Sequence, residues 1–334
     1  MGNEAYLRLL DSFASKRITI LGDFLLDQYI VGNASRVSRE APIVVVDYID
    51  TLNHPGGAAN AAQNVATLGA KARTIGVLGD DREGDALAEL LGRVGVETEG
   101  LQRSGGYATP VKLRIMAGEL NAQKQQVARV DRSRPIRASE ELLGRLENAI
   151  AAAVADSDGV VVSDYAIGLV PGRISAAAIR LSREKGIPVV VDSRFNLLDY
   201  PGASVATPNE VEALEALKIR ETAEVDPLEI SRSLRRRSGI GGIVITRGSL
   251  GMVVCDSSDH VDTIGIVGSN QATDVTGAGD TVSVVIALSL ACGAGLFDAA
   301  RMATFAAAVV VMKRGTATAA PEEVRAVIEA HAPR

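Results

Sequence analysis

One acidic residue stands directly after a turn of very small residues. Gly277, Ala278 and Gly279 precede Asp280, and the apolar run from Thr281 to Cys292 predicts a buried helix after them. The first backbone N–H groups of a helix have no partners within it, and the helix dipole places positive potential there. Small residues let an anion approach such a backbone closely. The stretch therefore predicts an anion site with a carboxylate beside it.

The carboxylate of Asp280 has two chemical interpretations. Beside a bound phosphate it is unfavourable unless it has a task, and the obvious task is to accept a proton from an attacking hydroxyl. Alternatively, Asp280 only stabilises the helix dipole as an acid in the first turn, which is the commoner role for an isolated Gly-x-Gly-Asp. The rest of the chain has to decide between them.

Other acids follow short apolar runs. Asp23 comes directly after the run Ile18 to Gly22, Asp27 follows it closely, and Asp164 comes after the run Gly159 to Ser163. Such runs are typical of buried parallel strands. Open parallel sheets place their ligands at the carboxyl ends of their strands. We therefore expect these side chains at one ligand-binding edge.

Two adjacent glycines open another helix of small residues. Gly56 and Gly57 precede a helix expected to reach about Leu68, and Asn60 would project from its first turn. Adjacent glycines permit close approach of a ligand, but they equally permit tight packing of the helix. Without further context the two interpretations have equal weight.

A hairpin is predicted from two alternating segments, 107–117 and 123–131, with a turn over 118–122. Lys112 and Arg114 share one face of the first segment, and Arg129 lies on the second. The pattern is compatible with a solvated face of a sheet. It is also compatible with a basic patch on a lid that meets an anionic substrate.

The elements that would position these residues alternate regularly from residue 139 onward, helix followed by strand. This rhythm predicts a mostly parallel sheet with helices on both faces. Two segments break it, at about 28–50 and 107–130, and both are expected to form a small antiparallel excursion. No repeat or linker divides the chain, so residues 1–334 are expected to form a single domain. The expected helices are 4–15, 58–68, 82–95, 139–154, 172–185, 226–238, 278–292, 296–312 and 321–331, and the expected strands are 18–22, 43–49, 73–79, 159–163, 187–191, 242–246, 251–255 and 260–264.

Composition limits the classes of partner. The chain has 35 basic and 41 acidic residues, a net charge of −6, and 3% aromatic residues without tryptophan. This balance argues against nucleic acid or an anionic membrane as a partner. The two cysteines and three histidines show no spacing typical of metal ligands or a disulfide. The N-terminus lacks a signal-peptide core, so a cytoplasmic location is expected.

Three motifs in order resemble the ribokinase-like (PfkB) sugar kinases: GG-x-x-N at Gly56 to Asn60, N-x-x-E at Asn209 to Glu212, and D-x-x-GAGD at Asp274 to Asp280. The resemblance extends over roughly residues 17 to 325. With three motifs present, the catalytic interpretation of Asp280 becomes the preferred one. Longer segments look like the kinase module of the heptose-7-phosphate kinases that supply ADP-heptose for lipopolysaccharide, namely residues 22–46, 55–70, 163–168, 207–212 and 274–281. Those enzymes often carry a fused nucleotidyltransferase, and we expect this chain to be a stand-alone kinase.

The resemblance implies a fold and a reaction. The fold would be α/β, a three-layer α/β/α ribokinase-like fold with a mostly parallel central sheet and a small antiparallel β lid that also forms a homodimer surface. The reaction would be ATP-dependent transfer of the γ-phosphate to a hydroxyl of a sugar or sugar phosphate, first of all the C1 hydroxyl of heptose 7-phosphate. ATP and Mg²⁺ would be required, and K⁺ is a candidate third component. The lid would exclude water.

The same resemblance assigns roles to individual residues. Asp280 would be the catalytic base, and the three residues before it would form an anion hole. The remaining assignments are Asn209, Glu212, Thr246, Arg247 and Gly248 for ATP, with Glu212 holding Mg²⁺ through water; Asp23, Asp27, Gly56, Gly57, Asn60, Lys112, Arg114 and Asp164 for the sugar; and Asp274 and Thr276 for a monovalent cation.

Two departures bear on the choice of sugar. Ile167 stands where a lysine is expected after Ser-Asp-Tyr-Ala, and Asp192-Ser193-Arg194 stands where Asp-Pro-Lys is expected. Arginine and lysine are not equivalent at phosphates. A kinase for another sugar, sugar phosphate or nucleoside is therefore the first alternative. A catalytically silent regulator that binds sugar or nucleotide is the second, and the intact Asp280, Asn209 and Glu212 disfavour it.

Overall fold

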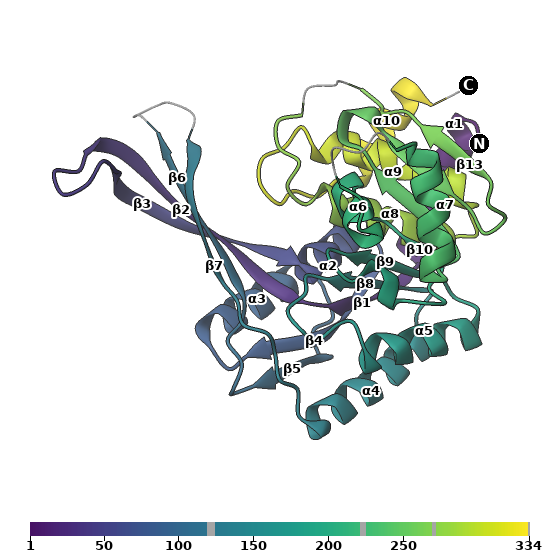
Figure 1. Ribbon diagram of the computed structural model, residues 1–334, viewed down its shortest axis with the longest axis horizontal. Coiled ribbons are helices and arrows are strands. Elements are labelled where there is room, and N and C mark those ends of the chain that lie inside the picture. Colours follow the sequence, from purple (N-terminus) through teal and green to yellow (C-terminus); the bar gives the residue numbers. More distant parts are fainter. Residues whose placement is uncertain (119–123, 221–224, 269–271, 333–334) are drawn as a thin grey trace.

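A nine-stranded sheet forms the centre of the molecule (Figure 1). The computed structural model describes residues 1–118, 124–220, 225–268 and 272–332. The strands of this sheet are β1 (Arg17–Gly22), β4 (Lys71–Gly79), β5 (Leu101–Ser104), β8 (Gly159–Asp164), β9 (Val189–Ser193), β10 (Val205–Ala206), β11 (Gly242–Thr246), β12 (Met252–Cys255) and β13 (Val261–Ile264). Their spatial order is β13-β12-β11-β10-β9-β8-β1-β4-β5. Neighbouring strands are parallel except at one edge, where β12 is antiparallel to β11 and β13.

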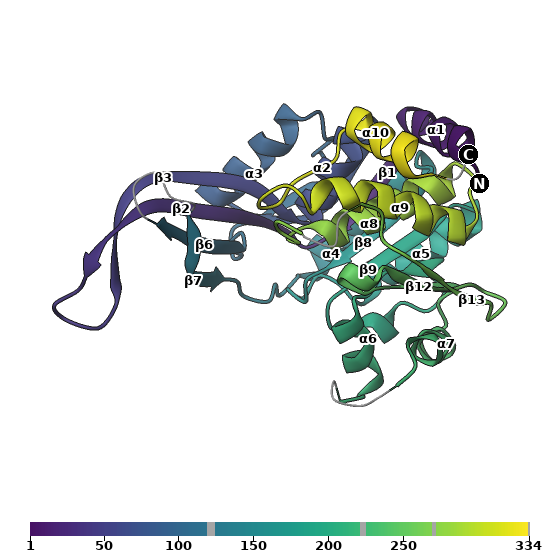
Figure 2. The ribbon, with the colours of Figure 1, turned by 90° about the horizontal axis from the view of Figure 1, so that it is seen from above.

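Helices cover both faces of this sheet and complete three layers (Figure 2). On one face lie α1 (Asn3–Ser12), α2 (Ala58–Thr67), α3 (Arg82–Arg93), α8 (Ala278–Ala291), α9 (Leu296–Val310) and α10 (Pro321–His331). On the other lie α4 (Glu140–Ala155), α5 (Arg173–Lys185), α6 (Glu210–Leu217) and α7 (Pro227–Ser238). Strand side chains alternate between the two apolar clusters, because successive residues of a strand point to opposite faces. In β8, Val161 packs with the first cluster, and Val160 and Val162 pack with the second.

A second sheet projects from the body as a lid (Figure 1). It contains β2 (Phe24–Val37), β3 (Val44–Gly57), β6 (Val111–Gly118) and β7 (Gln125–Arg132), in the order β3-β2-β6-β7. Both hairpins are antiparallel, and β2 joins β6 in parallel. The first hairpin starts one residue after β1 and runs directly into α2. The Ala58 amide donates to the Asp23 carbonyl at 3.1 Å, which closes the base of this hairpin.

The predicted architecture is confirmed, and the differences are local. The first lid hairpin is longer than the expected excursion at 28–50, because its strands continue to Phe24 and Gly57. The short strands β5 and β10, and β2 as a strand, were not predicted. Residues 119–122 of the expected hairpin turn lie outside the described residues.

The most apolar helices belong to the core. Helices α8 and α9 pack against each other and, with α2, form much of one apolar cluster. Helix α8 is buried over most of its circumference, which explains its lack of a polar face. Within the ranges that the structure describes, no helix combines the length and hydropathy that crossing a bilayer would require.

We predict opposite effects on stability for two glycine substitutions. A Cβ on Gly22 would lie 2.2 Å from the Ser163 carbonyl oxygen and force β1 away from β8, whereas a Cβ on Gly92 in α3 meets open space. Gly22→Ala should therefore lower the free energy of unfolding by about 1–3 kcal/mol or more, and Gly92→Ala should raise it by roughly 0.5–1 kcal/mol. Urea unfolding of both variants checks this. Equal midpoints would contradict the close packing of β1 against β8 at Gly22.

Candidate active site

Helix α8 begins as the sequence predicts, at the carboxyl edge of the sheet. Gly277 is its N-cap with φ 81°, a left-handed conformation that favours glycine. Its missing side chain also matters, since a Cβ there would lie 2.8 Å from Nδ2 of Asn60. The Ala278 amide donates to the Val275 carbonyl, while the amides of Gly279 and Asp280 have no partner among the described residues. The three predicted anion-hole residues thus form a helix N-terminus able to bind an anion.

Asp280 is buried in the first turn of α8, with 3% of its surface exposed. Its Oδ2 accepts a hydrogen bond from Nδ2 of Asn60 at 2.7 Å, and its Oδ1 lies 3.3 Å from the Tyr165 hydroxyl, which donates. Burial raises the pKa of Asp280 to about 6, although the Asn60 bond, the charge of Lys112 and the Tyr165 bond oppose the rise. A carboxylate with this pKa is ionised at neutral pH and basic enough to accept a proton.

Asn60 therefore supports Asp280 directly. In turn, Nδ2 of Asn64 donates to the Asn60 carbonyl at 2.9 Å and contacts its Oδ1 at 3.3 Å. The Thr281 hydroxyl donates to Oδ1 of Asn64 at 2.8 Å. This buried network joins α2 to α8 and fixes the orientation of the carboxylate between them.

Two more acids face the same region from β1 and the lid. Asp23 is buried, and its Oδ2 accepts hydrogen bonds from the Tyr165 and Ile167 amides at 2.9 and 3.1 Å. Burial outweighs these bonds and raises the pKa of Asp23 to about 7. Asp27 is also buried and pairs with Arg114 at 2.5 Å.

The two predicted glycines hold the lid against these acids. Gly57 has φ 57°, and a Cβ on it would lie 2.8 Å from the Asp23 carbonyl oxygen. A Cβ on Gly56 would lie 2.7 Å from Oδ2 of Asp27. Both glycines are therefore required by close packing at the base of the lid, beside the predicted sugar site.

Asn209 and Glu212 form a reciprocal cap at the start of α6. The Asn209 amide donates to Oε2 of Glu212, and the Glu212 amide donates to Oδ1 of Asn209, both at 2.9 Å. Burial raises the pKa of Glu212, which Arg194 partly opposes. Such a capping box is a structural device in its own right. It also fixes a carboxylate beside the carboxyl ends of β9 and β11.

A cavity of about 400 Å³ lies between that cap and α8. Its wall includes Asn209, Thr246 and Gly248 on one side and Ala278 and Gly279 on the other, and apolar residues of α8 and α9 fill in the rest. Arg247 points to Glu210, 3.0 Å away. Three of the five predicted nucleotide residues, Asn209, Thr246 and Gly248, thus line one mostly apolar cavity, which suits a flat base with its phosphates at the helix N-terminus.

The predicted monovalent-cation residues form a compact loop before α8. Oδ1 of Asp274 accepts hydrogen bonds from the Thr276 amide and hydroxyl, and its Oδ2 accepts one from the Gly315 amide at 2.9 Å. Burial alone would raise the pKa of Asp274, but these bonds hold it below its usual value. Within the described residues, no cluster of three or more His, Cys, Asp or Glu side chains is arranged to hold a metal ion.

The inner face of the lid carries the predicted cations. Lys112 pairs in register with Asp27 and Asp131, and Arg114 pairs with Tyr29 and Arg129, so these side chains share one face. Arg129 binds Asp131 through two hydrogen bonds. With Arg114 bound to Asp27, both arginines already have carboxylate partners. Lys112 instead lies over the Tyr165 ring, 4.2 Å from its centroid.

Asp164 was predicted to bind substrate, and the structure gives it several protein partners. Its Oδ2 accepts hydrogen bonds from the Ser193 and Tyr200 hydroxyls at 2.7 Å and from Nδ2 of Asn196 at 3.0 Å. Its Oδ1 accepts one from the Ala166 amide at 2.8 Å. These bonds tie the loop after β8 to the loop after β9.

Two residues of the site were given no role from the sequence. Tyr165 directly follows the strand-end acid Asp164, and Asp192 stands near the end of β9, so their positions at strand ends were the available signal. A Cβ on Gly279 would lie 3.8 Å from Oδ2 of Asp192, which places this carboxyl at the anion hole. Burial, with Asp280 and Glu212 nearby, raises the pKa of Asp192 well above its usual value.

The two departures from the family pattern lie at this site as well. Ile167 is buried, and its backbone amide donates to Oδ2 of Asp23, whereas its apolar side chain has no group that could bind a phosphate. Arg194 is exposed, and its guanidinium lies over the Phe195 ring at 5.4 Å. Its charge acts on both Lys112 and Glu212, so it stands between the lid and the cap of α6.

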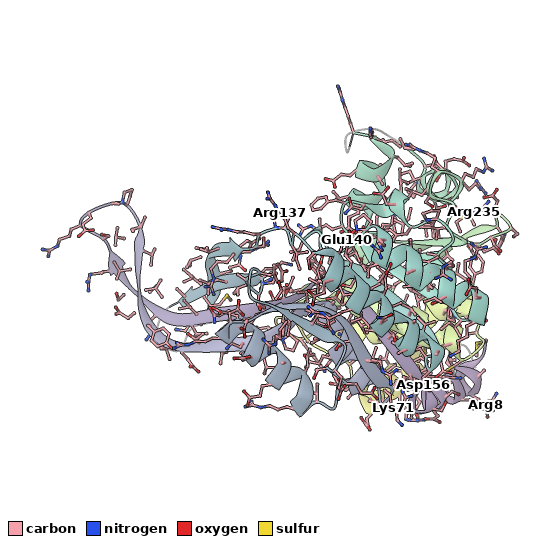
Figure 3. The ribbon with its side chains drawn as sticks, turned by 90° about the horizontal axis from the view of Figure 1, so that it is seen from below. Arg8, Lys71, Arg137, Glu140, Asp156 and Arg235 are labelled. Carbon is pink, nitrogen blue, oxygen red and sulfur yellow. The ribbon has the colours of Figure 1, made fainter. Side chains whose placement is uncertain are left out.

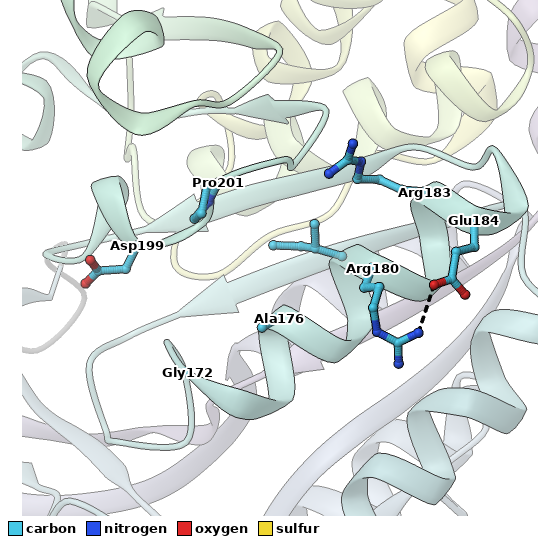
Figure 4. Close-up of a pocket in the computed structure, with 8 residues that line it drawn as sticks. Gly172, Ala176, Arg180, Arg183, Glu184, Asp199 and Pro201 are labelled. Carbon is cyan, nitrogen blue, oxygen red and sulfur yellow. Dashed lines mark hydrogen bonds and ion pairs between the residues drawn. The ribbon is translucent and has the colours of Figure 1, made fainter.

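Two cavities elsewhere contain none of the predicted site residues. One, of about 670 Å³, lies between α5 and the turn at Asp199 and Pro201, where Arg180 pairs with Glu184 at 2.9 Å (Figure 4). The other, of about 320 Å³, lies at the amino-terminal edge of the sheet and includes Lys71 and Asp156 (Figure 3). Neither combines a buried acid with a helix N-terminus.

A family model described as "pfkB family carbohydrate kinase" matches residues 20–323, almost the whole chain from β1 to α10. The chain belongs to the pfkB family of carbohydrate kinases. This pfkB kinase is therefore a phosphotransferase with an alcohol group as acceptor. Its three motifs meet around the start of α8, where that chemistry requires a base and an anion site together.

Curated relatives and solved structures agree with this membership. The bifunctional protein HldE of Gluconobacter oxydans is 38% identical over 321 residues, which cover 95% of this chain and 65% of the relative. The HldE protein of Citrifermentans bemidjiense is 36% identical over 314 residues, which cover 93% and 63%. The pfkB kinase thus spans somewhat less than two thirds of the length of these relatives.

The solved structures show the ribokinase-like fold. Arabidopsis thaliana ribokinase complexed with ribose and ATP superimposes with a TM-score of 0.72 at 18% identity, covering 94% of this chain and 99% of that one. Escherichia coli phosphofructokinase-2 in complex with potassium gives 0.74 at 18% identity, covering 94% and 98%.

We predict that Asp280→Asn abolishes most turnover and leaves nucleotide binding intact. The amide cannot accept the hydroxyl proton, so kcat should fall by about 10²–10⁴-fold, the range for loss of a general base. Calorimetric affinity for ATP should change little, because Asp280 is not part of the nucleotide cavity. Turnover near that of the wild type would show that another group takes the proton.

A second prediction concerns stability and needs no substrate. The folded-state pKa of Asp280, about 6, exceeds its ordinary value of 3.8, so its contribution to stability is full below about pH 4 and is lost as pH rises through about 6. Asparagine does not titrate. Relative to wild type, Asp280→Asn should therefore gain on the order of 2–3 kcal/mol between about pH 4 and pH 7. Urea unfolding at both pH values measures the difference, and the opposite trend would contradict burial as the dominant cause.

Proposed function

We propose that this pfkB kinase transfers the γ-phosphate of ATP to a sugar phosphate, with the C1 hydroxyl of heptose 7-phosphate as the first candidate acceptor. The observation that carries the proposal is the position of Asp280, a buried base in the first turn of a helix whose free amides face a nucleotide-sized cavity. Sugar-binding acids, Asp23 and Asp27, approach from the other side. The HldE relatives support the choice of a heptose phosphate.

Each group of side chains has a role in this reaction. Asp280 accepts the proton of the acceptor hydroxyl, and Asn60 holds the carboxylate. The amides of Gly279 and Asp280 stabilise charge on the phosphoryl group as it transfers. We assign Glu212 and Asn209 as the residues that would hold Mg²⁺ through water. When bound, ATP would supply the phosphoryl group and Mg²⁺ would neutralise charge on the phosphates.

The acceptor side favours a phosphorylated sugar. A cavity of about 700 Å³ lies between the inner face of the lid and the loops at 273–276 and 314–315. Arg114, Lys124 and Arg314 line it, against one acid, Asp274. Asp27 balances the charge of Arg114, and Asp274 carries one negative charge against Lys124 and Arg314, so the cavity still offers a net positive environment to a phosphate on the sugar.

We also place the contact with a second copy of the chain at the lid. Its strands expose apolar side chains that a monomer would leave in water, which supports a homodimer through the lid. These residues are Val37, Ile43, Val44, Tyr48, Ile49, Val127 and Val130.

Two further elements complete the proposal. Asp274, Thr276 and the Gly315 backbone form the loop where we place a monovalent cation, and the potassium complex of the phosphofructokinase-2 neighbour supports K⁺. We place the enzyme in the cytoplasm, where ATP is available, with a small-molecule acceptor and no nucleic-acid or membrane partner.

A different sugar remains the second candidate, because a specific observation favours it. Ile167 contributes only a backbone amide, and Arg194 has a planar guanidinium where a lysine is expected. These changes alter the rim of the acceptor site and leave Asp280 and its partners in place. The geometry of Asp280 likewise disfavours a silent regulator.

We predict that the purified enzyme with Mg²⁺ and ATP releases ADP fastest with heptose 7-phosphate. The panel should include fructose phosphates, ribose, fructose and nucleosides, each with and without K⁺. Faster release with another acceptor would transfer the proposal to that sugar. Absence of release with every acceptor, from protein that binds ATP, would instead favour the silent regulator.

Arginine substitutions should then locate the phosphate of the acceptor. Arg314 is exposed on the wall of the lid cavity, whereas Arg129 is held by Asp131. Arg314→Ala should raise KM for the phosphorylated sugar by about tenfold, near the value of one charge-assisted hydrogen bond, and should leave KM for the unphosphorylated sugar unchanged. Arg129→Ala serves as the matched control. A larger selective effect at Arg129 would place the phosphate on the outer part of the lid sheet.

A further inference from the structure

Tyr165 connects the lid to Asp280. Its hydroxyl lies 3.3 Å from Oδ1 of Asp280, and the ammonium of Lys112, from lid strand β6, lies 4.2 Å from the centre of its ring. Lys112 thus reaches the body of the enzyme through an aromatic face, a favourable cation–π arrangement. The hydroxyl distance is longer than that of an ordinary O–H···O bond, and catalytic hydrogen bonds of this kind shorten when substrate is bound.

The position of Tyr165 is built into the loop after β8. Its amide donates to Oδ2 of Asp23, and the next amide, of Ala166, donates to Oδ1 of Asp164. Ala166 has φ 59°, a left-handed conformation that a residue with a side chain rarely adopts. Such conformations persist where the surroundings hold them, and they cluster at functional sites. Here two carboxylates hold the loop, and the tyrosine ring is directed between Lys112 and Asp280.

We propose that Tyr165 is a positioning residue for the Asp280 carboxylate, and that Lys112 acts on Asp280 through Tyr165 when the lid covers the site. This inference rests on the proposed function, since it assumes that Asp280 is the base. The two oxygens of Asp280 then have separate partners, Asn60 on Oδ2 and Tyr165 on Oδ1. Fixing both oxygens directs the remaining lone pairs toward the acceptor hydroxyl.

The charges around Asp280 explain why such a device is needed. Asp27 and Asp192 both lie near Asp280, and a carboxylate beside other carboxylates is driven to bind a proton. A donated hydrogen bond and a nearby cation both favour the charged form. The groups that face Asp280 from the surrounding elements are Asp27 on β2, Lys112 on β6, Tyr165 after β8 and Asp192 on β9.

A lid that carries the cation links ionisation of the base to closure. With Lys112 over the ring, Tyr165 is held against Asp280 and the carboxylate is kept ionised. Without that contact, Asp280 loses influences that favour its charged form, so a larger fraction of it is protonated and cannot accept a proton. Water at an open site would then meet a weaker base, which limits wasteful hydrolysis of ATP.

Three variants test the assignment. Tyr165→Phe keeps the ring under Lys112 and removes the hydroxyl, Lys112→Met removes the charge and keeps the length, and Lys112→Arg restores a cation. Tyr6→Phe is the matched control, because the Tyr6 hydroxyl donates to Asp298 at 3.0 Å in a similar tyrosine–aspartate pair between α1 and α9. That pair is remote from the site.

The kinetic readouts are kcat, KM and the acidic limb of the kcat–pH profile. Tyr165→Phe and Lys112→Met should each lower kcat by about tenfold or more and move the acidic limb to higher pH, because both changes favour protonated Asp280. Lys112→Arg should recover most of kcat, and Tyr6→Phe should leave the profile in place. Changes in KM alone, with kcat and the limb unaltered, would overturn the proposal.

Combining the substitutions tests whether Lys112 acts through Tyr165. The loss in the double variant should be smaller than the product of the two single losses, as for residues in one interaction. A strictly multiplicative loss would show that the two residues act independently and would overturn that part of the proposal.

A titration without substrate separates this inference from the proposed function. The ¹³C signal of the Asp280 carboxyl, assigned by comparison with Asp280→Asn, should titrate at higher pH in Tyr165→Phe than in wild type. An unchanged midpoint would overturn the inference even if the enzyme is an active kinase. A shifted midpoint in a protein that phosphorylates no sugar would support the inference and contradict the proposed function.

Discussion

The structure depends on keeping one carboxylate ionised in a crowded, buried place. Asp280 shares its surroundings with Asp27 and Asp192, and burial raises the pKa of both Asp280 and Asp192. The helix N-terminus, the amide of Asn60 and the lid lysine oppose this tendency. Burial and the nearby charges of Asp280 and Glu212 raise the pKa of Asp192 well above its usual value. A raised pKa lowers the average negative charge of Asp192 beside the amides where phosphates would approach.

The topology explains how these groups meet. Parallel strands end at one edge of the sheet, and β1, β8 and β9 each have an acid at or next to that end. The lid is inserted at this same edge, because its first hairpin leaves β1 at Asp23 and returns into α2 at Ala58. The base of the lid therefore lies at the proposed acceptor site. Its glycines, Gly56 and Gly57, are fixed by contacts with Asp27 and Asp23. A displacement of the lid would change the environment of the acids directly.

The sequence predicted what depends on local pattern. The βαβ alternation gave the sheet and its layers, and the small residues before Asp280 correctly located the helix N-terminus. The sequence pattern could not identify the partners of Lys112 and Arg114, because these partners depend on contacts between segments distant in the chain. Alternation placed Lys112 and Arg114 on one face, and the register sets Lys112 opposite Asp27. Only the side-chain positions show that Arg114 pairs with Asp27 while Lys112 reaches Tyr165. Tyr165 stands in the segment 163–168 that carries the resemblance, but its contacts with Lys112 and Asp280 depend on segments distant in the chain.

The contrast between Asp23 and Asp280 suggests how one site both recognises and activates a sugar. Burial raises the pKa of Asp23 to about 7 and that of Asp280 to about 6, so at neutral pH the two carry different average charge. A carboxyl that is half protonated can donate to or accept from a sugar hydroxyl, whereas an ionised one can only accept. Asp23 lacks a cation of its own and bonds to backbone amides, while Asp280 has Lys112 within reach. These different environments support the proposal that Asp23 recognises the sugar and Asp280 accepts the proton.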